Sequence, residues 1–200
     1  MIPVINFMFY GYALNTAETA MRKQKELPEY LNFGKLFLNG LMTLVISFVY
    51  FLPVLIIFGI IIAVNLPHME GMYNLLISGE TISTGFFVSG WKIAAFASIG
   101  LMLIPVIFYV LSGALMNYAE TRTFSSAFQL NHIFKKIITW TFFIAWIISV
   151  IVVMAINYVG GEVAGLFGVV PFLRYAVSSF FSVVSVLFAC TLLGQAYSEA

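Results

Sequence analysis

The sequence predicts an all-α fold, a polytopic transmembrane helical bundle with two parallel internal repeats and interfacial amphipathic helices. Three observations lead to this prediction. Hydrophobic residues make up 62% and charged residues 8% of the 200 residues, whereas an ordinary globular domain has about 45–50% and about 25%. Several apolar stretches are long enough to cross a bilayer, and one short sequence motif occurs twice.

Four stretches satisfy the length that a membrane span requires. A spanning helix needs about 20 apolar residues to cross a hydrocarbon core about 30 Å thick. The four stretches cover about 36–65, 89–118, 138–159 and 172–196, and none carries a charge at its centre. The segment 2–14 is also apolar but is too short to span, so we expect a short N-terminal helix there.

Two basic segments are predicted to lie in the headgroup plane. Residues 21–40 and 123–137 each combine Lys side chains with apolar side chains at helical spacing, and Pro28 suits the first turn of a helix. Short amphipathic helices with a basic face are typical of the membrane interface. We therefore expect each segment to be one interfacial helix that leads into a span.

The repeated motif organises the chain. "IPVINFMFYGYALNTAET" (2–19) and "IPVIFYVLSGALMNYAET" (104–121) agree at nine of eighteen positions with a constant shift of 102. The shared residues include Gly11/Gly113, Asn15/Asn117 and Glu18/Glu120. Both copies should end on the same side of the membrane, which makes the repeats parallel and relates them by an axis along the membrane normal. The predicted organisation is one transmembrane domain (1–200), with repeat one at about 20–121, repeat two at about 122–200 and a partial copy at 2–19.

The first copy lacks a counterpart of residues 89–103, which complete the span of the second copy. Two interpretations remain open at this point. Either the first copy is a half-span shielded by neighbouring subunits, or the natural chain continues upstream by about 15 residues to complete a span.

The distribution of basic residues predicts the orientation. Cytoplasmic loops carry an excess of Lys and Arg. Seven of the nine basic residues fall within 15–40 and 118–138, whereas Lys92 and Arg174 adjoin the expected outer loops 66–91 and 160–174. We therefore expect a multi-pass protein of the cell membrane with its amphipathic segments and its C-terminus in the cytoplasm.

The candidate functional residues are charged groups at this expected cytoplasmic rim. A glutamate at a helix C-terminus opposes the helix dipole, so its recurrence at three helix ends calls for a partner. One interpretation is a ring of carboxylates that binds a cation or a partner's basic patch. The favoured interpretation is a set of rim ion pairs, since such pairs are common and contribute little energy. The candidate rim or partner contacts are Glu18, Arg22, Glu120, Lys135, Lys136 and Glu199, with Glu18–Arg22 and Glu120 with Lys135 or Lys136 as the expected pairs.

Hydroxyl and amide side chains recur along two of the spans, and two prolines lie mid-span. These residues are Asn39, Thr43 and Ser47 in the first span, Ser178, Ser182 and Ser185 in the last, and Pro53 and Pro105. Polar stripes and Pro-broken helices can line a transport path. Close helix packing with backbone groups satisfied by neighbours is the favoured interpretation.

Catalytic and metal-binding patterns are not found in the sequence. The chain has no Asp, no HExxH pattern and no glycine-rich phosphate loop, and its single cysteine, Cys190, excludes an internal disulfide. No span centre carries the charged side chain that coupled ion transport commonly uses. We expect no enzyme activity, no catalytic residue, no cofactor, no metal and no nucleic-acid partner.

The segment "GYALNTAETAMRKQKELPEYLNFGKLFLNGL" (11–41) resembles the start of the archaeal and bacterial membrane family catalogued as domain of unknown function 4013. The matching features are a Gly-Tyr at a helix end, a basic stretch and a Leu-Pro-Glu, here at 11–12, 22–25 and 27–29. The later "AFQLNHIFKKI" and "GQAYSEA" are also similar. The resemblance implies a polytopic membrane protein and brings no known activity, cofactor or catalytic residue.

The function that these observations favour is a non-catalytic accessory or scaffold subunit of a membrane complex. Its partners would be membrane lipids and either other membrane protein subunits or further copies of itself. The alternative is a small transporter or channel that uses the Pro-broken helices and the hydroxyl-lined faces. The uncharged span centres favour the subunit.

Overall fold

The structure is a computed structural model that describes residues 3–24, 28, 32–78, 84–168 and 170–200; within these, the side chains of 3–4, 61–62, 64–78, 84–97 and 99 are not described. The described chain is helical and contains no strand, which confirms the all-α prediction. Its α-helices are α1 (Pro3–Met21), α2 (Phe33–Ser78), α3 (Thr84–Thr121), α4 (Leu130–Ile137), α5 (Trp140–Leu166) and α6 (Pro171–Glu199), with a 3-10 helix η1 (Phe124–Phe128) before α4.

Four of these helices contain segments that are long and apolar enough to cross a membrane, as predicted. The segments are Phe33–Ile60, Gly100–Thr121, Trp140–Leu166 and Pro171–Glu199. The outer loops predicted at 66–91 and 160–174 were too long. Helix α2 continues to Ser78, α3 already begins at Thr84, and only a short connection separates α5 from α6. Hydrophobicity measures the apolar length of a segment, and a helix does not have to end where its apolar segment ends.

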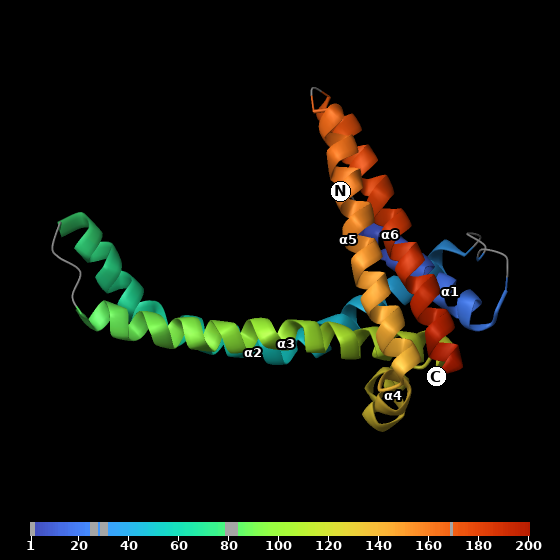
Figure 1. Ribbon diagram of the computed structural model, residues 1–200, viewed down its shortest axis with the longest axis horizontal. Helices are drawn as coiled ribbons and strands as arrows, with labels where there is room; N and C mark the ends of the chain where they lie inside the picture. The colour runs from blue at the N-terminus through green and yellow to red at the C-terminus, as the bar shows by residue number, and fades with distance from the viewer. Residues whose placement is uncertain (1–2, 25–27, 29–31, 79–83, 169) are drawn as a thin grey trace. The chain divides into compact units, whose positions relative to one another are not determined.

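The chain divides into two compact units, which we describe separately. Unit 2 (Phe48–Phe108) contains the later part of α2 and most of α3, which run side by side in Figure 1. Phe51 and Phe108 stack edge-to-face with ring centroids 5.0 Å apart. A Cβ placed on Gly100 would lie 3.1 Å from the ring of Phe58. Unit 2 is therefore a pair of helices joined by contacts between aromatic rings and by an aromatic ring packed on a glycine.

Unit 1 (Met1–Ser47 and Tyr109–Ala200) contains the most extensively packed helices. In Figure 1, α5 and α6 run side by side, and α1 also contacts α6. Small residues allow these approaches, since a Cβ on Gly160 would lie 2.5 Å from the Phe181 side chain and one on Gly194 would lie 2.5 Å from the Ala17 carbonyl oxygen. Such close contacts between helix backbones drive association in lipid, where apolar burial cannot.

Two glycines that the repeat pairs with each other lie at helix crossings. A Cβ on Gly11 would lie 1.9 Å from the carbonyl oxygen of Leu36, where α1 meets the start of α2. A Cβ on Gly113 would lie 2.3 Å from Cγ2 of Ile137, where α3 meets α4. At both crossings only a residue without a side chain allows the observed separation.

The prediction of a single amphipathic helix over 21–40 was wrong. Helix α1 ends at Met21, Lys23 adopts a left-handed backbone with φ 53°, and Gln24, Pro28 and Asn32 are not helical. Residues 25–27 and 29–31 lie outside the described part of the chain. From Phe33 onward the predicted segment belongs to α2 itself, because its apolar side chains continue without a break into the span.

The prediction for 123–137 was right in helical content and wrong in continuity. The segment forms η1 and α4, which are separated at Gln129. Ile133 and Ile137 of α4 are fully buried, whereas Leu130 and Phe134, two of the apolar side chains at helical spacing in this segment, are 46% and 39% exposed. Contacts with Gly113, and not the apolar pattern alone, decide which side chains of α4 are buried.

Candidate functional site

Glu18, in the last turn of α1, binds two arginines. Arg22 Nη2 lies 2.7 Å from Glu18 Oε1, one helical turn away, which is one of the expected rim pairs. Arg122, at the end of α3, donates from Nε to Glu18 Oε2 at 2.9 Å and forms a second ion pair through Nη2. The side chains of Arg122 and Glu18 are only 23% and 21% exposed. Partial burial makes this pair stronger than an exposed ion pair.

Asn15, one turn before Glu18, joins three segments of unit 1. Its Oδ1 accepts a hydrogen bond from Asn39 Nδ2 of α2 at 3.1 Å and another from Arg122 Nη2 at 2.6 Å. Arg122 itself has a left-handed backbone with φ 57°, a conformation that costs a non-glycine residue about 1–3 kcal/mol. The bonds to Glu18 and Asn15 offset this cost and hold the guanidinium in place.

A second ion pair joins α3 to α4. Lys136 Nζ lies 3.2 Å from Glu120 Oε2, which is the other expected rim pair, with Lys136 as the partner. The same ammonium lies 4.3 Å from the centroid of the Tyr197 ring of α6. Tyr197 is fully buried and stacks edge-to-face on Phe142 of α5 at 5.9 Å. The ammonium group of Lys136, on α4, therefore contacts α3 through an ion pair and α6 through a cation–π interaction.

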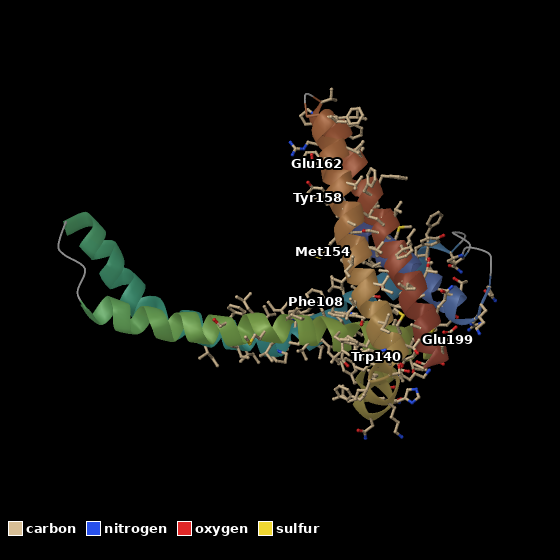
Figure 2. The ribbon with its side chains drawn as sticks, in the orientation of Figure 1. Phe108, Trp140, Met154, Tyr158, Glu162 and Glu199 are labelled. Carbon is tan, nitrogen blue, oxygen red and sulfur yellow. The ribbon has the colours of Figure 1, made fainter. Side chains whose placement is uncertain are left out.

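The two remaining candidates lie apart from these pairs. Lys135 is exposed on α4 and lines a shallow depression with Asn131, Phe134, Ile138 and Thr139. Glu199 is exposed at the end of α6, where Figure 2 labels it. Neither side chain forms an ion pair with a residue that the structure describes.

Arg122 was not predicted as a partner of Glu18. The two residues are 104 positions apart, so no helical spacing connects them. A signal was nevertheless present, because the repeat pairs Glu18 with Glu120, and Arg122 follows Glu120 by two positions. Packing the two equivalent helix ends side by side would bring Arg122 close to Glu18.

A cavity of about 260 Å³ opens beside the Glu18–Arg122 pair. Residues from the end of α1, the segment after it, the start of α2 and the end of α3 form its wall. They are Asn15, Glu18, Thr19, Arg22, Gln24, Pro28, Asn32, Lys35, Leu36 and Arg122. In the described part of this wall, one carboxylate thus faces three cations beside several amide groups.

The polar side chains of the predicted stripes form local hydrogen bonds. Thr43 donates to the carbonyl oxygen of Asn39 at 2.9 Å, and Ser47 donates to that of Thr43 at 2.8 Å. On the other stripe, Ser182 donates to Asn157 Oδ1 at 2.9 Å, and Asn157 Nδ2 donates to Ser185 Oγ at 2.9 Å. The second set crosses from α6 to α5 and so contributes to helix packing.

No group of three or more His, Cys, Asp or Glu side chains gathers among the residues whose positions the structure describes. The absence of a metal, a cofactor or an enzyme activity remains a prediction. The chemistry that the described site does offer is ion pairing and hydrogen bonding at the ends of α1, α3 and α6.

Four apolar helices with charged ends define the class as helical proteins with several segments able to cross a membrane. Within this class, the chain belongs to the family described as "Protein of unknown function (DUF4013)", whose model matches residues 1–165. This match confirms the family resemblance found in the sequence. Comparisons with curated proteins and with solved structures find no significant match.

Proposed function

We propose that this protein is a non-catalytic accessory or scaffold subunit of a membrane complex. The observation that carries the proposal is a pair of uncovered glycines on α5. A Cβ on Gly161 or on Gly165 would meet no atom of the described chain within 4 Å, whereas the neighbouring Gly160 is covered by Phe181 of α6. Two glycines four residues apart let a second transmembrane helix approach closely.

The face of α5 that carries these glycines extends along the helix. Met154 and Tyr158 are 69% and 71% exposed. Figure 2 shows them, with Glu162, along the side of α5 that faces away from α6. Helical periodicity adds Gly161 and Gly165 to this face. Large apolar side chains beside small ones suit a transmembrane helix of another membrane protein, which we take as the partner.

The hydrogen bonds of the polar stripes support a subunit over a transporter. A permeation path needs polar groups that can bind a passing solute. The hydroxyls of Thr43 and Ser47 instead bind carbonyl groups of their own helix, and Ser182 and Ser185 bind Asn157. These groups are already used in local structure and packing.

The orientation and the internal repeat belong to the same proposal. The positive-inside rule assigns the ends of α1 and α3, together with α4 and the C-terminus, to the cytoplasm. Corresponding bonds at the two copies support the repeat, since Thr19 donates to the Asn15 carbonyl oxygen at 3.0 Å and Thr121 donates to that of Asn117 at 3.0 Å. The contacts of Gly11 and Gly113 with the following helices support it as well.

Purification from native membranes in a mild detergent tests the proposal. We expect a second membrane protein at fixed stoichiometry with this chain. The double variant Gly161→Leu/Gly165→Leu should lose that protein, because two bulky side chains keep the partner helix at a distance.

Ala155→Leu provides the matched control, since Ala155 is also exposed on α5 but lies about 120° from Gly161 and about 80° from Gly165 around the helix axis. This variant should keep the partner. A homo-oligomer without a second protein, unaffected by the glycine substitutions, would contradict the proposal and favour a transporter or channel.

A further inference from the structure

We propose that the cavity beside Glu18 and Arg122 binds a phosphate-bearing anion. The first argument is charge. Among the described residues of its wall, Arg22, Lys35 and Arg122 face one carboxylate, that of Glu18, which leaves two positive charges in excess. The carboxylate is already paired with both arginines, so the cavity repels cations and attracts an anion.

Helix dipoles modify this balance without reversing it. The cavity lies at the start of α2, where the dipole contributes roughly half a positive charge, and at the ends of α1 and α3, where each contributes roughly half a negative charge. The sum is about half a negative charge against two formal positive charges. The local field therefore remains positive.

Arg122 is held in position before any anion arrives. Glu18 and Asn15 bind its Nε and Nη2, while Nη1 is buried and has no hydrogen-bond partner among the described residues. The charge of Arg122 therefore acts on the cavity from a fixed position. The exposed guanidinium of Arg22 in the cavity wall is the group that an anion oxygen can reach, since a guanidinium matches phosphate oxygens in geometry and charge.

The first turn of α2 adds backbone donors. The first intrahelical bond of this segment runs from the Leu36 N–H to the Asn32 carbonyl oxygen at 3.0 Å. The N–H groups before Leu36 have no acceptor within the helix, and N–H groups at a helix start bind phosphate readily. Asn32, Lys35 and Leu36 all line the cavity, which places this helix start at the site.

The volume limits the ligand to a small group. A cavity of about 260 Å³ lies just below the range of about 300–1,000 Å³ that holds drug-sized molecules. It suits one phosphate group with a short substituent. Either the headgroup of an anionic phospholipid or a free phosphate satisfies this chemistry. The site lies on α1, α2 and α3, so it does not depend on the glycine face of α5.

The test uses the full chain in a neutral detergent without phosphate and follows its thermal unfolding. One arm adds sodium phosphate against sodium chloride at equal ionic strength. The other arm compares nanodiscs of phosphatidylglycerol with nanodiscs of phosphatidylcholine. A ligand that binds only the folded protein raises the unfolding temperature in a saturable way. Protection by phosphate identifies the free ion as the ligand, and protection only by phosphatidylglycerol identifies the lipid headgroup.

Arg22→Gln and Lys35→Gln should each weaken binding at least tenfold, since each removes an exposed cation from the cavity wall. Lys135→Gln removes the same charge from an exposed position on α4 outside the cavity and should leave binding unchanged. Equal losses in all three variants would indicate general electrostatic attraction and overturn the site. Failure of both phosphate and phosphatidylglycerol to protect the protein would overturn it as well.

Discussion

Arg122 and Glu18 form an ion pair across 104 residues of chain, with Nε 2.9 Å from Oε2. The pair joins the end of α3 to the end of α1, and Asn15 extends the connection to α2 through Asn39. Glu18, Asn15 and Arg122 thus link three segments of unit 1. The arrangement makes Glu18 a structural residue whatever else it binds.

Replacing this carboxylate should destabilise the protein. Glu18→Gln removes both ion pairs and leaves Arg122 without its counter-charge. We expect the free energy of unfolding to fall by about 1–2 kcal/mol, between the values for exposed and buried pairs. Thermal unfolding in detergent, followed by tryptophan fluorescence, measures the change. Glu199→Gln, which removes an exposed carboxylate without a described ion pair, should have no effect, and equal behaviour of the two variants would contradict a structural role for Glu18.

Gly11 should tolerate no side chain. Gly11→Ala would place a Cβ 1.9 Å from the Leu36 carbonyl oxygen, and a backbone atom of a packed helix cannot move aside cheaply. We expect a loss of about 1–3 kcal/mol or more from overpacking. Gly34→Ala is the control, because a Cβ there meets nothing within 4 Å in the described chain and alanine favours a helix by about 1 kcal/mol. Comparable yields of folded protein from both variants would contradict the close crossing of α1 and α2.

Charge placed at the middle of a span should reduce insertion. Ile148 of α5 and Phe188 of α6 are 43% and 42% exposed, and in a membrane their outward side chains would face lipid. Arg at either position should cost about 2.5–3.5 kcal/mol on insertion scales, so the amount of protein in the membrane should fall. Ile138→Arg, at the junction of α4 and α5, is the control and should accumulate normally. Normal accumulation of all three variants would mean that the two span positions face water, as a channel requires.

Cysteine labelling tests the proposed orientation. In a Cys190→Ala background, Gln24→Cys and Ser125→Cys should react with an impermeant reagent only from the cytoplasm. Gly168→Cys, in the turn between α5 and α6, should react only from outside. The reason is the concentration of basic residues near the first two positions. Labelling of residues 24 and 125 from opposite faces would exclude parallel repeats.

Helical content and the four spans could be predicted because both depend on local properties. An apolar stretch of about 20 residues satisfies its own backbone hydrogen bonds as a helix, wherever it lies in the fold. The ion pairs Glu18–Arg22 and Glu120–Lys136 could also be predicted from the sequence, since the two partners lie within one helical turn or at the ends of neighbouring α-helices. The prediction of an amphipathic helix over 21–40 was wrong, because the spacing of apolar residues does not reveal the left-handed backbone at Lys23.

The long apolar helices with charged ends follow from the amino-acid sequence alone, because hydrophobic length and charge are properties of neighbouring residues. Which helices meet, and which sites they form together, depends on the three-dimensional packing of the chain. Helix crossings depend on small residues such as Gly11 and Gly113 meeting surfaces far along the chain. The cavity beside Arg122 exists because the ends of α1 and α3 and the start of α2 converge. Contacts between distant segments arise from packing geometry, and local sequence patterns do not predict them.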